Sequence, residues 1–378
     1  MKTGWETRKI EDVCEVIPGQ SPNSRHYNQE ANGLPFYQGK REFTNRVLGQ
    51  PTKWTTFVTK KAIAGDIVMS VRAPVGPVNE VIEPICIGRG LATIRSGDKI
   101  EKDFLWYFLL SIQSEIEGKD GAVFPSINRQ EIESIELMLP PLEEQQRIVK
   151  ILDEAFAGLE TARSNIAVNL ESSKELFQSV LDESLSGAEE KGWEDRKIED
   201  VCEVISGQSP NGRYYNQEAN GLPFYQGKKE FTDRILGQPI KWTTFVTKEA
   251  VAGDIVMSVR APVGPVNEVS ERICIGRGLA AIRSGDEIKK DFLWYVLLNI
   301  QNEIECKDGA VFPSINRQEI ESIKLMLPTS KEQQNIVEKL DTLQAQTIRL
   351  QQEYTTQLAG IDELRQSLLQ KAFAGELT

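Results

Sequence analysis

The side chains best suited to chemistry in this sequence are polar and basic residues set among glycines and prolines. Arginine and lysine can pair with guanine or with phosphate, while glutamine and asparagine can pair with adenine. These residue types gather in two loops and at two separate arginines: Gln20, Ser21, Asn23, Arg25 and Tyr27; Gln38, Lys40 and Arg41; Arg72; and Arg89. The alternative for each residue is a local role, such as capping a turn or pairing with a neighbouring charge.

Two of these arginines have neighbours that favour close contact with a ligand. Arg72 precedes Ala73-Pro74, and Arg89 lies between Gly88 and Gly90. Glycine has no side chain beyond its Cα, so a backbone that contains it can approach another group closely. We therefore expect the backbone at both arginines to lie near whatever the chain binds.

Residue types for catalysis or metal binding are scarce. The chain has one histidine, His26, and five cysteines without a C-x-x-C spacing, which argues against a histidine-based metal site or general base. The segment from Gly33 to Lys40 is the nearest match to a P-loop, but five residues separate its glycines instead of four. We expect no catalytic residue, no metal ion and no cofactor in this chain, and a surface hydrogen bond for His26.

An internal repeat dominates the sequence. Gly4-Trp5-Glu6 recurs 188 residues later as Gly192-Trp193-Glu194, and the offset holds without insertion to Gly187 and Gly375. From residue 4 to 140, 117 of 137 positions are identical in the second copy, against 15 of 47 from residue 141 to 187. Each unit therefore has a part that is nearly identical in both copies and a part that has diverged. A period this long indicates two domains with connectors, not a solenoid.

The nearly identical part has the pattern of a mixed α/β domain. A Gly-Asp turn precedes the apolar run 67–71, which predicts a strand, and residues 135–139 predict a final strand before Pro140-Pro141. Asp103 is placed to cap a helix that begins there, and Asn128 to Glu131 matches a capping box. We expect the Trp54, Trp106, Trp242 and Trp294 rings in the core.

The diverged part predicts a long helix in each copy. Residues 142–185 contain no proline, and their apolar residues recur at spacings of three, four and seven. At 1.5 Å per residue, such a helix spans roughly 65 Å. A single apolar stripe of that length requires a partner helix, so we expect the two helices to form an antiparallel pair.

Charge is distributed unevenly along the chain. The formal charge is −12, which by itself argues against a DNA-binding surface. Residues 141–190 carry −7 of it, whereas residues 1–140 carry −1, and the stretch from Tyr37 to Lys61 has six basic residues and one acidic residue. The first residues lack a signal-peptide core, and no uncharged apolar run reaches membrane-span length. We expect a cytoplasmic protein with no membrane partner.

The sequence resembles the specificity subunit of type I restriction-modification systems over its whole length. The marks are Gly19-Gln20-Ser21-Pro22 through Tyr27-Asn28, then Gly33 to Gly39, and the segment Leu139-Pro140-Pro141-Leu142-Glu143-Glu144-Gln145-Gln146 where a domain meets its helix. The ending Gln370 to Leu377 is also similar to the family's C-termini. The resemblance implies four parts: target-recognition domains at 1–140 and 188–328, and long spacer helices at 141–187 and 329–378.

The resemblance also implies a function and partners. Each domain would read one half of a split DNA site, and the helices would set the spacing and dock two modification (methyltransferase) subunits. Those subunits methylate adenine with S-adenosylmethionine, and restriction subunits, where present, use ATP and Mg²⁺ to cleave DNA. The second domain would use the equivalent DNA-binding residues: Gln208, Ser209, Asn211, Arg213, Tyr215, Gln226, Lys228, Lys229, Arg260 and Arg277.

The near-identity of the domains predicts what kind of site they read. Antiparallel helices would relate the two domains by a pseudo-two-fold axis, and identical readers so related see the same sequence on opposite strands. We therefore expect an interrupted near-palindrome. The alternative is a two-domain scaffold or binding protein with a coiled-coil spacer and no DNA target. The acidic helices suit that alternative, but the basic, glutamine-containing loops do not.

Overall fold

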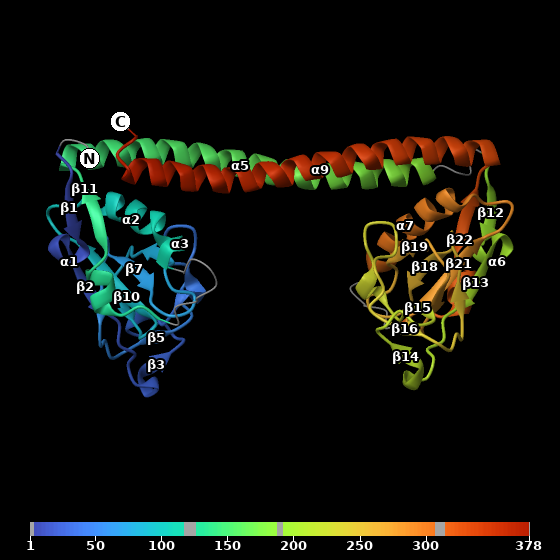
Figure 1. Cartoon of the computed structure of the whole chain (residues 1–378), viewed down its shortest axis with the longest axis horizontal. Coiled ribbons are helices and arrows are strands. Elements are labelled where there is room, and N and C mark those ends of the chain that lie inside the picture. The colour runs from blue at the N-terminus through green and yellow to red at the C-terminus, as the bar shows by residue number, and fades with distance from the viewer. Residues whose placement is uncertain (1–3, 117–125, 187–191, 307–313, 378) are drawn as a thin grey trace. The chain divides into compact units, whose positions relative to one another are not determined.

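The computed structural model describes residues 4–116, 126–186, 192–306 and 314–377 of the chain (Figure 1). It divides into two compact units. Unit 1 comprises Met1–Ala167 and Thr355–Thr378, and unit 2 comprises Val168–Tyr354. Each unit therefore combines one domain with part of both long helices. The predicted domain boundary between residues 187 and 188 lies outside the described residues.

Unit 1 contains three sheets with short helices. Its strands are β1 (Glu6–Lys9), β2 (Cys14–Pro18), β3 (Tyr27–Asn28), β4 (Leu34–Tyr37), β5 (Trp54–Thr55), β6 (Lys61–Ala62), β7 (Ile67–Ser70), β8 (Val78–Glu80), β9 (Ile85–Ile87), β10 (Leu91–Ser96) and β11 (Glu136–Leu139). Its helices are α1 (Ile10–Val13), α2 (Lys102–Ser111), α3 (Gln113–Ile116) and α4 (Arg129–Glu133), with 3₁₀ turns η1 (Ser24–His26) and η2 (Lys40–Glu42).

Unit 2 repeats this arrangement. Its strands are β12 (Glu194–Lys197), β13 (Cys202–Ser206), β14 (Tyr215–Asn216), β15 (Leu222–Tyr225), β16 (Trp242–Thr243), β17 (Glu249–Ala250), β18 (Ile255–Ser258), β19 (Val266–Glu268), β20 (Ile273–Ile275), β21 (Leu279–Ser284) and β22 (Lys324–Leu327). Its helices are α6 (Ile198–Val201), α7 (Lys290–Cys306) and α8 (Arg317–Glu321), with 3₁₀ turns η4 (Gly212–Tyr214) and η5 (Lys228–Glu230).

An antiparallel four-stranded sheet, in the order β2-β10-β7-β8, forms the middle layer of unit 1. Strand β7 is buried on both faces because its residues alternate between two cores. Ile67 and Met69 join the larger core with α2, while Val68 joins a smaller core with Ile85 and Ile87 of the neighbouring sheet. That second sheet, β3-β5-β4-β9-β6, is antiparallel except for the parallel pair β4 and β9. The predicted strand at 67–71 is confirmed.

The long helices are α5 (Leu142–Leu185) and α9 (Ser330–Phe373). Within unit 1, Phe156 of α5 lies 4.8 Å from the Arg365 guanidinium of α9, and Arg163 pairs with Asp362. Within unit 2, the Lys339 ammonium lies 3.4 Å from the Ser184 hydroxyl. In unit 1, rising residue numbers on α5 meet falling numbers on α9, so the two helices run antiparallel there, as expected.

The junction between domain and helix depends on one buried amide, that of Gln145. It is fully buried and accepts a hydrogen bond from the Glu101 backbone N–H at 2.8 Å. Its Nε2 donates to the carbonyls of Pro140 at 2.8 Å and Lys99 at 3.1 Å. Gln333 makes the equivalent three bonds in unit 2. The side chain thus pairs three backbone groups that burial would otherwise leave unsatisfied.

One helix start was wrongly predicted. Helix α2 is capped by Glu101, whose carboxylate accepts from the Phe104 N–H at 2.8 Å, and Asp103 lies inside the first turn. Asp103 instead pairs with Arg46, which draws its carboxylate away from the helix N–H groups. The capping box at Asn128 and Glu131 is confirmed, with bonds of 3.1 and 2.7 Å. Trp106 and Trp294 are core residues as expected, whereas Trp54 and Trp242 are only partly buried.

Candidate nucleic-acid interface

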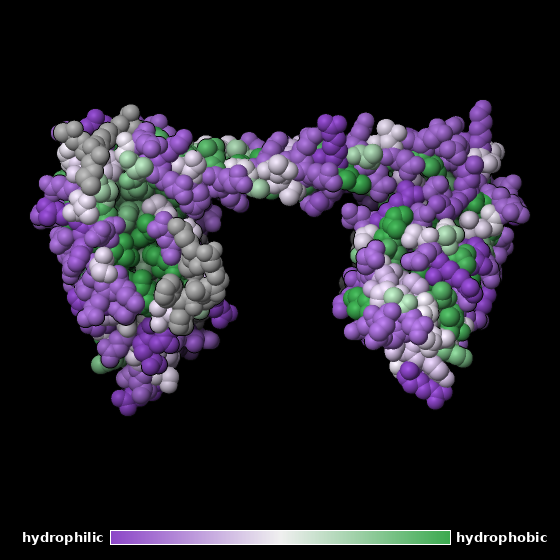
Figure 2. Space-filling model, viewed as in Figure 1, coloured by the Kyte–Doolittle hydropathy of each residue, from purple (hydrophilic) through white to green (hydrophobic). Residues whose placement is uncertain are grey.

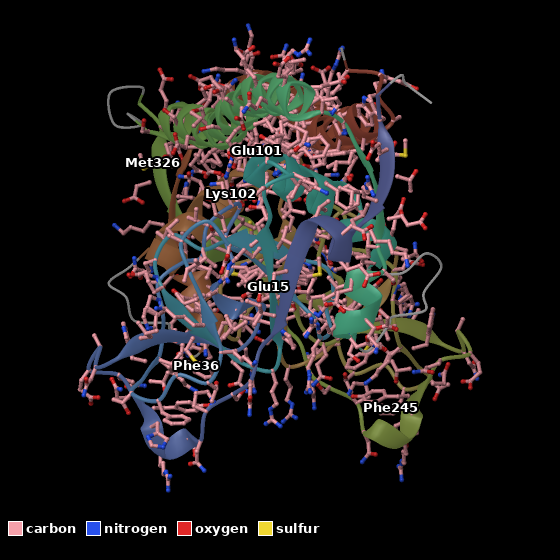
Figure 3. The ribbon with its side chains drawn as sticks, turned by 90° about the vertical axis from the view of Figure 1, so that its left-hand side faces the viewer. Glu15, Phe36, Glu101, Lys102, Phe245 and Met326 are labelled. Atoms are coloured by element: carbon pink, nitrogen blue, oxygen red, sulfur yellow. The ribbon has the colours of Figure 1, made fainter. Side chains whose placement is uncertain are left out.

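The end of each unit away from the long helices carries the predicted turn that contains Arg25 or Arg213. In unit 1, strands β3 and β5 and the turn η1 lie at the opposite end from α5 (Figure 1), and this tip shows mainly hydrophilic side chains (Figure 2). Phe36 and Phe245, labelled in Figure 3, each lie near the tip of their own unit. The sheets and their cores lie between the long helices and these turns, so η1 and η4 are held at the end of each unit away from α5 and α9.

Four predicted residues line a shallow pocket in unit 1. Gln38, Lys40, Arg72 and Arg89 surround it together with Gly39, Ser70, Ala73 and Gly90. The four come from segments that follow β4, β7 and β9, and all four side chains are exposed. Two arginines, a lysine and a glutamine on one open surface form a donor-rich patch suited to phosphate oxygens and base edges.

The glycines beside Arg89 serve the protein's own packing. A Cβ on Gly90 would lie 2.2 Å from the Gln38 carbonyl oxygen, and one on Gly88 would lie 2.9 Å from the Ser21 hydroxyl. The expected close approach therefore takes place between segments of the domain itself. It brings Gln38 and Arg89 onto one surface.

Ser21 and Asn23 support the loops through local bonds. The Ser21 hydroxyl accepts a hydrogen bond from the Arg89 N–H at 3.2 Å. The Asn23 side chain caps η1 by accepting from the Arg25 N–H at 3.1 Å. Both bonds recur in unit 2, at Ser209 with Arg277 (3.1 Å) and Asn211 with Arg213 (3.2 Å).

Tyr27 lies beneath the tip as part of its scaffold. Its ring stacks on Phe36 with centroids 4.8 Å apart, and its hydroxyl donates to the Pro22 carbonyl at 2.8 Å. Burial raises the pKa of the Tyr27 phenol, and the nearby Cys86 thiol adds to the rise. Tyr215 has the same partners in unit 2, Phe224 and Pro210.

The remaining predicted residues have exposed side chains. The Gln20 backbone donates to the Ile87 carbonyl at 3.0 Å and accepts from the Thr59 hydroxyl. Lys40 and Arg41 begin the turn η2, and Arg25 extends from η1. The equivalent exposed residues of unit 2 are Gln208, Arg213, Gln226, Lys228, Lys229, Arg260 and Arg277.

Not all of the basic stretch from Tyr37 to Lys61 faces outward. Arg46 is only partly exposed: it pairs with Glu80 at 3.3 Å and with Asp103, and lies over the Trp106 ring. Burial acts to lower the pKa of Arg46, but the Asp103 and Glu80 carboxylates raise it above its usual value. Its charge is therefore neutralised inside the unit, and the stretch offers less positive surface than its composition suggests.

Phe57 and its equivalent Phe245 are exposed residues that the sequence pattern did not predict. Their side chains are 54% and 51% exposed, although each lies at the tip beside a stacked partner. The His26 ring lies 5.2 Å from Phe57, and the Tyr214 ring lies 5.0 Å from Phe245. A phenylalanine in a Thr-rich, strand-like run carries no signal of exposure, so only the structure could reveal it.

Among the residues that the structure describes, no cluster of three or more histidine, cysteine or carboxylate side chains has an arrangement that could hold a metal ion. Within the same residues, no helix combines the length and hydrophobicity that crossing a bilayer would require.

Comparison with known proteins places the chain in a family. The sequence model of the type I restriction modification DNA specificity domain matches residues 2–170 and 190–359. A putative type I restriction enzyme MjaX specificity subunit from Methanocaldococcus jannaschii is 31% identical over 372 residues, which span 90% of this chain and 86% of that protein. The EcoDI specificity subunit of Escherichia coli is 23% identical over 99% of this chain and 89% of its own length.

Solved structures agree with the sequence match. A chain from a structure described as the basis of complex assembly and conformational transition of the type I R-M system has a TM-score of 0.87 and 28% identity, covering 100% of this chain and 99% of that one. The HsdS subunit from Thermoanaerobacter tengcongensis has a TM-score of 0.64 and 26% identity, with 100% and 98% covered.

The chain therefore belongs to the type I restriction-modification DNA specificity family. It is a DNA sequence-recognition subunit, the non-catalytic member of a complex that works with DNA and with other subunits. The scaffold alternative without a DNA target is not favoured.

Proposed function

We propose that each unit reads one half of a bipartite DNA site and that the two halves form an interrupted near-palindrome. Domains identical at 117 of 137 positions carry nearly the same reading groups. Two such readers that face opposite strands read the same sequence in opposite directions.

The observation that carries this proposal is the match between the two candidate interfaces. The Ser–Arg bond, the Asn cap and the Tyr–Phe stack recur in unit 2 with distances that agree within 0.1 Å. Arg72 and Arg260 both form a backbone bridge to a serine, Ser126 and Ser314. The two units thus hold the same side chains in the same local geometry.

Within each interface we assign contact roles by exposure. Arg25, Gln38, Lys40, Arg41, Arg72 and Arg89, with their equivalents in unit 2, contact phosphates or base edges. Ser21, Asn23 and Tyr27 act mainly by holding the loops in place, because their polar atoms already bond to neighbouring backbone. About half or more of the DNA contacts are expected at phosphates.

We further propose that α5 and α9 set the spacing between half-sites and dock two modification subunits. The net charge of −7 over residues 141–190 suits a protein partner better than a phosphate backbone. The same face of B-DNA returns about every 10–10.5 bp. The length of α5 and α9 must therefore place both domains where each can contact its half-site. S-adenosylmethionine, ATP and Mg²⁺ would be bound by partner subunits, and the complex would act in the cytoplasm.

Methylation mapping tests the near-palindrome directly. The chain is assembled with its modification subunits, incubated with genomic DNA and S-adenosylmethionine, and the modified adenines are located by long-read sequencing. We expect one bipartite motif whose halves are reverse complements at all but one or two positions. Clearly unlike half-sites would contradict the proposal, and modification subunits without this chain provide the background.

A further inference from the structure

The two tips differ at a residue that holds an exposed arginine. Between residues 19 and 40 the domains differ only at Ser24 and His26, which are Gly212 and Tyr214 in unit 2. Residue 26 follows Arg25 in η1, and Tyr214 follows Arg213 in η4. The substitution therefore changes the immediate surroundings of the same arginine in the two units.

In unit 1 the arginine is held through its Nε. Arg25 Nε donates to His26 Nε2 at 3.1 Å. A neutral imidazole that accepts at Nε2 carries its proton on Nδ1. Within the described part of the chain, no hydrogen bond occupies the Arg25 Nη1 or Nη2 atoms. The outer edge of this guanidinium can thus donate two parallel N–H bonds.

In unit 2 the arginine is held through its Nη2. Arg213 Nη2 donates to the Tyr214 hydroxyl at 2.6 Å, and the guanidinium lies 4.7 Å from the centre of the Tyr214 ring. One hydrogen of Nη2 is therefore engaged inside the protein. The Tyr214 hydroxyl keeps its own hydrogen and can donate it to a ligand. The equivalent group in unit 1 is the His26 imidazole.

Both rings rest on an exposed phenylalanine, Phe57 in unit 1 and Phe245 in unit 2. His26 stacks on Phe57 with an interplanar angle of 28°, and Tyr214 stacks on Phe245 at 24°. The two tips thus share the phenylalanine and differ in the ring that stacks on it. The difference between them is one of hydrogen-bonding chemistry rather than of loop shape.

Bidentate recognition of guanine requires two N–H donors from one arginine edge. We infer that residue 26 and its equivalent 214 determine specificity: they set which N–H groups of the neighbouring arginine face the DNA, and so make the two half-sites differ at one position. This inference rests on the proposed function, in which each unit reads a half-site. The inference adds to that function the residue at which the two nearly identical domains differ in base recognition.

The other differences near the interface are less suited to this role. Arg41 and Lys229 are both exposed cations on equivalent turns. A Cβ added to Gly212 would meet no atom within 4 Å, so Ser24 occupies open space. Asn45 lines a separate pocket with Trp106 and Asp153 of α5, on the side of unit 1 that faces its helices.

A pair of exchange variants tests the inference. His26→Tyr gives unit 1 the residue of unit 2, and Tyr214→His does the reverse. Both variants use a residue that the equivalent turn already accommodates, so folding is expected to be retained. Ile82→Ser is the matched control, because it also replaces an exposed unit 1 residue with its unit 2 equivalent, Ser270, and Ile82 has no assigned DNA contact. Each variant is assembled with modification subunits, and base preference is measured on a library randomised at every half-site position.

We expect His26→Tyr to change the preferred base at one position of one half-site by about 10-fold, making that half match the other. Tyr214→His should shift the opposite half, and Ile82→Ser should leave base preferences unchanged. The inference is overturned if His26→Tyr alters no base preference or weakens all sequences equally. Because the effect is measured within one half-site, it remains readable even if wild-type half-sites prove unrelated and the near-palindrome fails.

Discussion

At the scale of residues, Arg72 is the sharpest test of the candidate interface. Its side chain is exposed beside the pocket that also holds Gln38 and Arg89, and Arg260 is its equivalent. Arg72→Ala should weaken DNA binding by the assembled complex. If Arg72 contacts a phosphate, all sequences weaken alike and the salt slope falls by about one. If it contacts a base, the loss is about 1–3 kcal/mol at one position.

The measurement is DNA affinity as a function of salt for specific and mutated sites. Arg8→Ala is a suitable control, because Arg8 pairs with Glu6 on β1 and lies outside the tip loops. Unchanged affinity, salt slope and base preference in Arg72→Ala would remove Arg72 from the interface.

Residue type determined how much of the interface could be predicted from the sequence. Exposure of charged residues such as Lys40 and Arg89 follows from their chemistry, since unpaired charges stay in water. Arg46 has the same residue type, yet three carboxylates from distant parts of unit 1 pair with it and leave it only partly exposed. Phe57 shows the reverse case, an apolar residue left exposed. Both exceptions arise from tertiary contacts that a local pattern does not contain.

At the scale of elements, the start of α5 is held to its domain by Gln145. Gln145→Leu would leave the Glu101 N–H and the Lys99 and Pro140 carbonyls without this partner. Since an unsatisfied buried polar group costs about 1–3 kcal/mol, we expect unit 1 to lose about 2–4 kcal/mol of unfolding free energy. Urea denaturation followed by tryptophan fluorescence measures this loss. The neighbouring Gln146 is exposed, so Gln146→Leu should have little effect, and equal losses in both variants would refute this role for Gln145.

Elements with strong local sequence signals were predictable. An element whose boundary depends on which side chain is free to cap it was not. The proline-free segment at 142–185 coincides with α5, because helix formers and an apolar stripe act over its whole length. The beginning of α2 depended on which carboxylate was free to cap it. Asp103 is bound to Arg46 and Glu101 is not, and Arg46 lies 57 positions away in the sequence.

At the scale of the whole chain, the repeat was the most informative feature of the sequence. It predicted two equivalent domains, and the structure gives both the same strand order, down to the parallel pair in the second sheet. Where the two copies differ at neighbouring positions, the residues within each copy remain compatible with each other. Where Thr7 and Glu136 become Asp195 and Lys324, the new residues form a salt bridge at 3.3 Å. The compensating pair lies within one domain.

The net charge leads to a prediction for the complete chain. With −12 overall and Arg46 and Arg234 neutralised by internal carboxylates, the isolated chain has little positive surface to displace the counterions of DNA. We expect it to bind its target at least about 100-fold more weakly than the assembly with modification subunits does at physiological salt. A mobility-shift titration with and without a modification subunit, repeated at two salt concentrations, measures both affinity and salt slope. The steeper slope should belong to the assembly, because most of the phosphate contacts come from the added subunits. Equal affinity and slope for the chain alone would show instead that the exposed cations of its two tips suffice for binding.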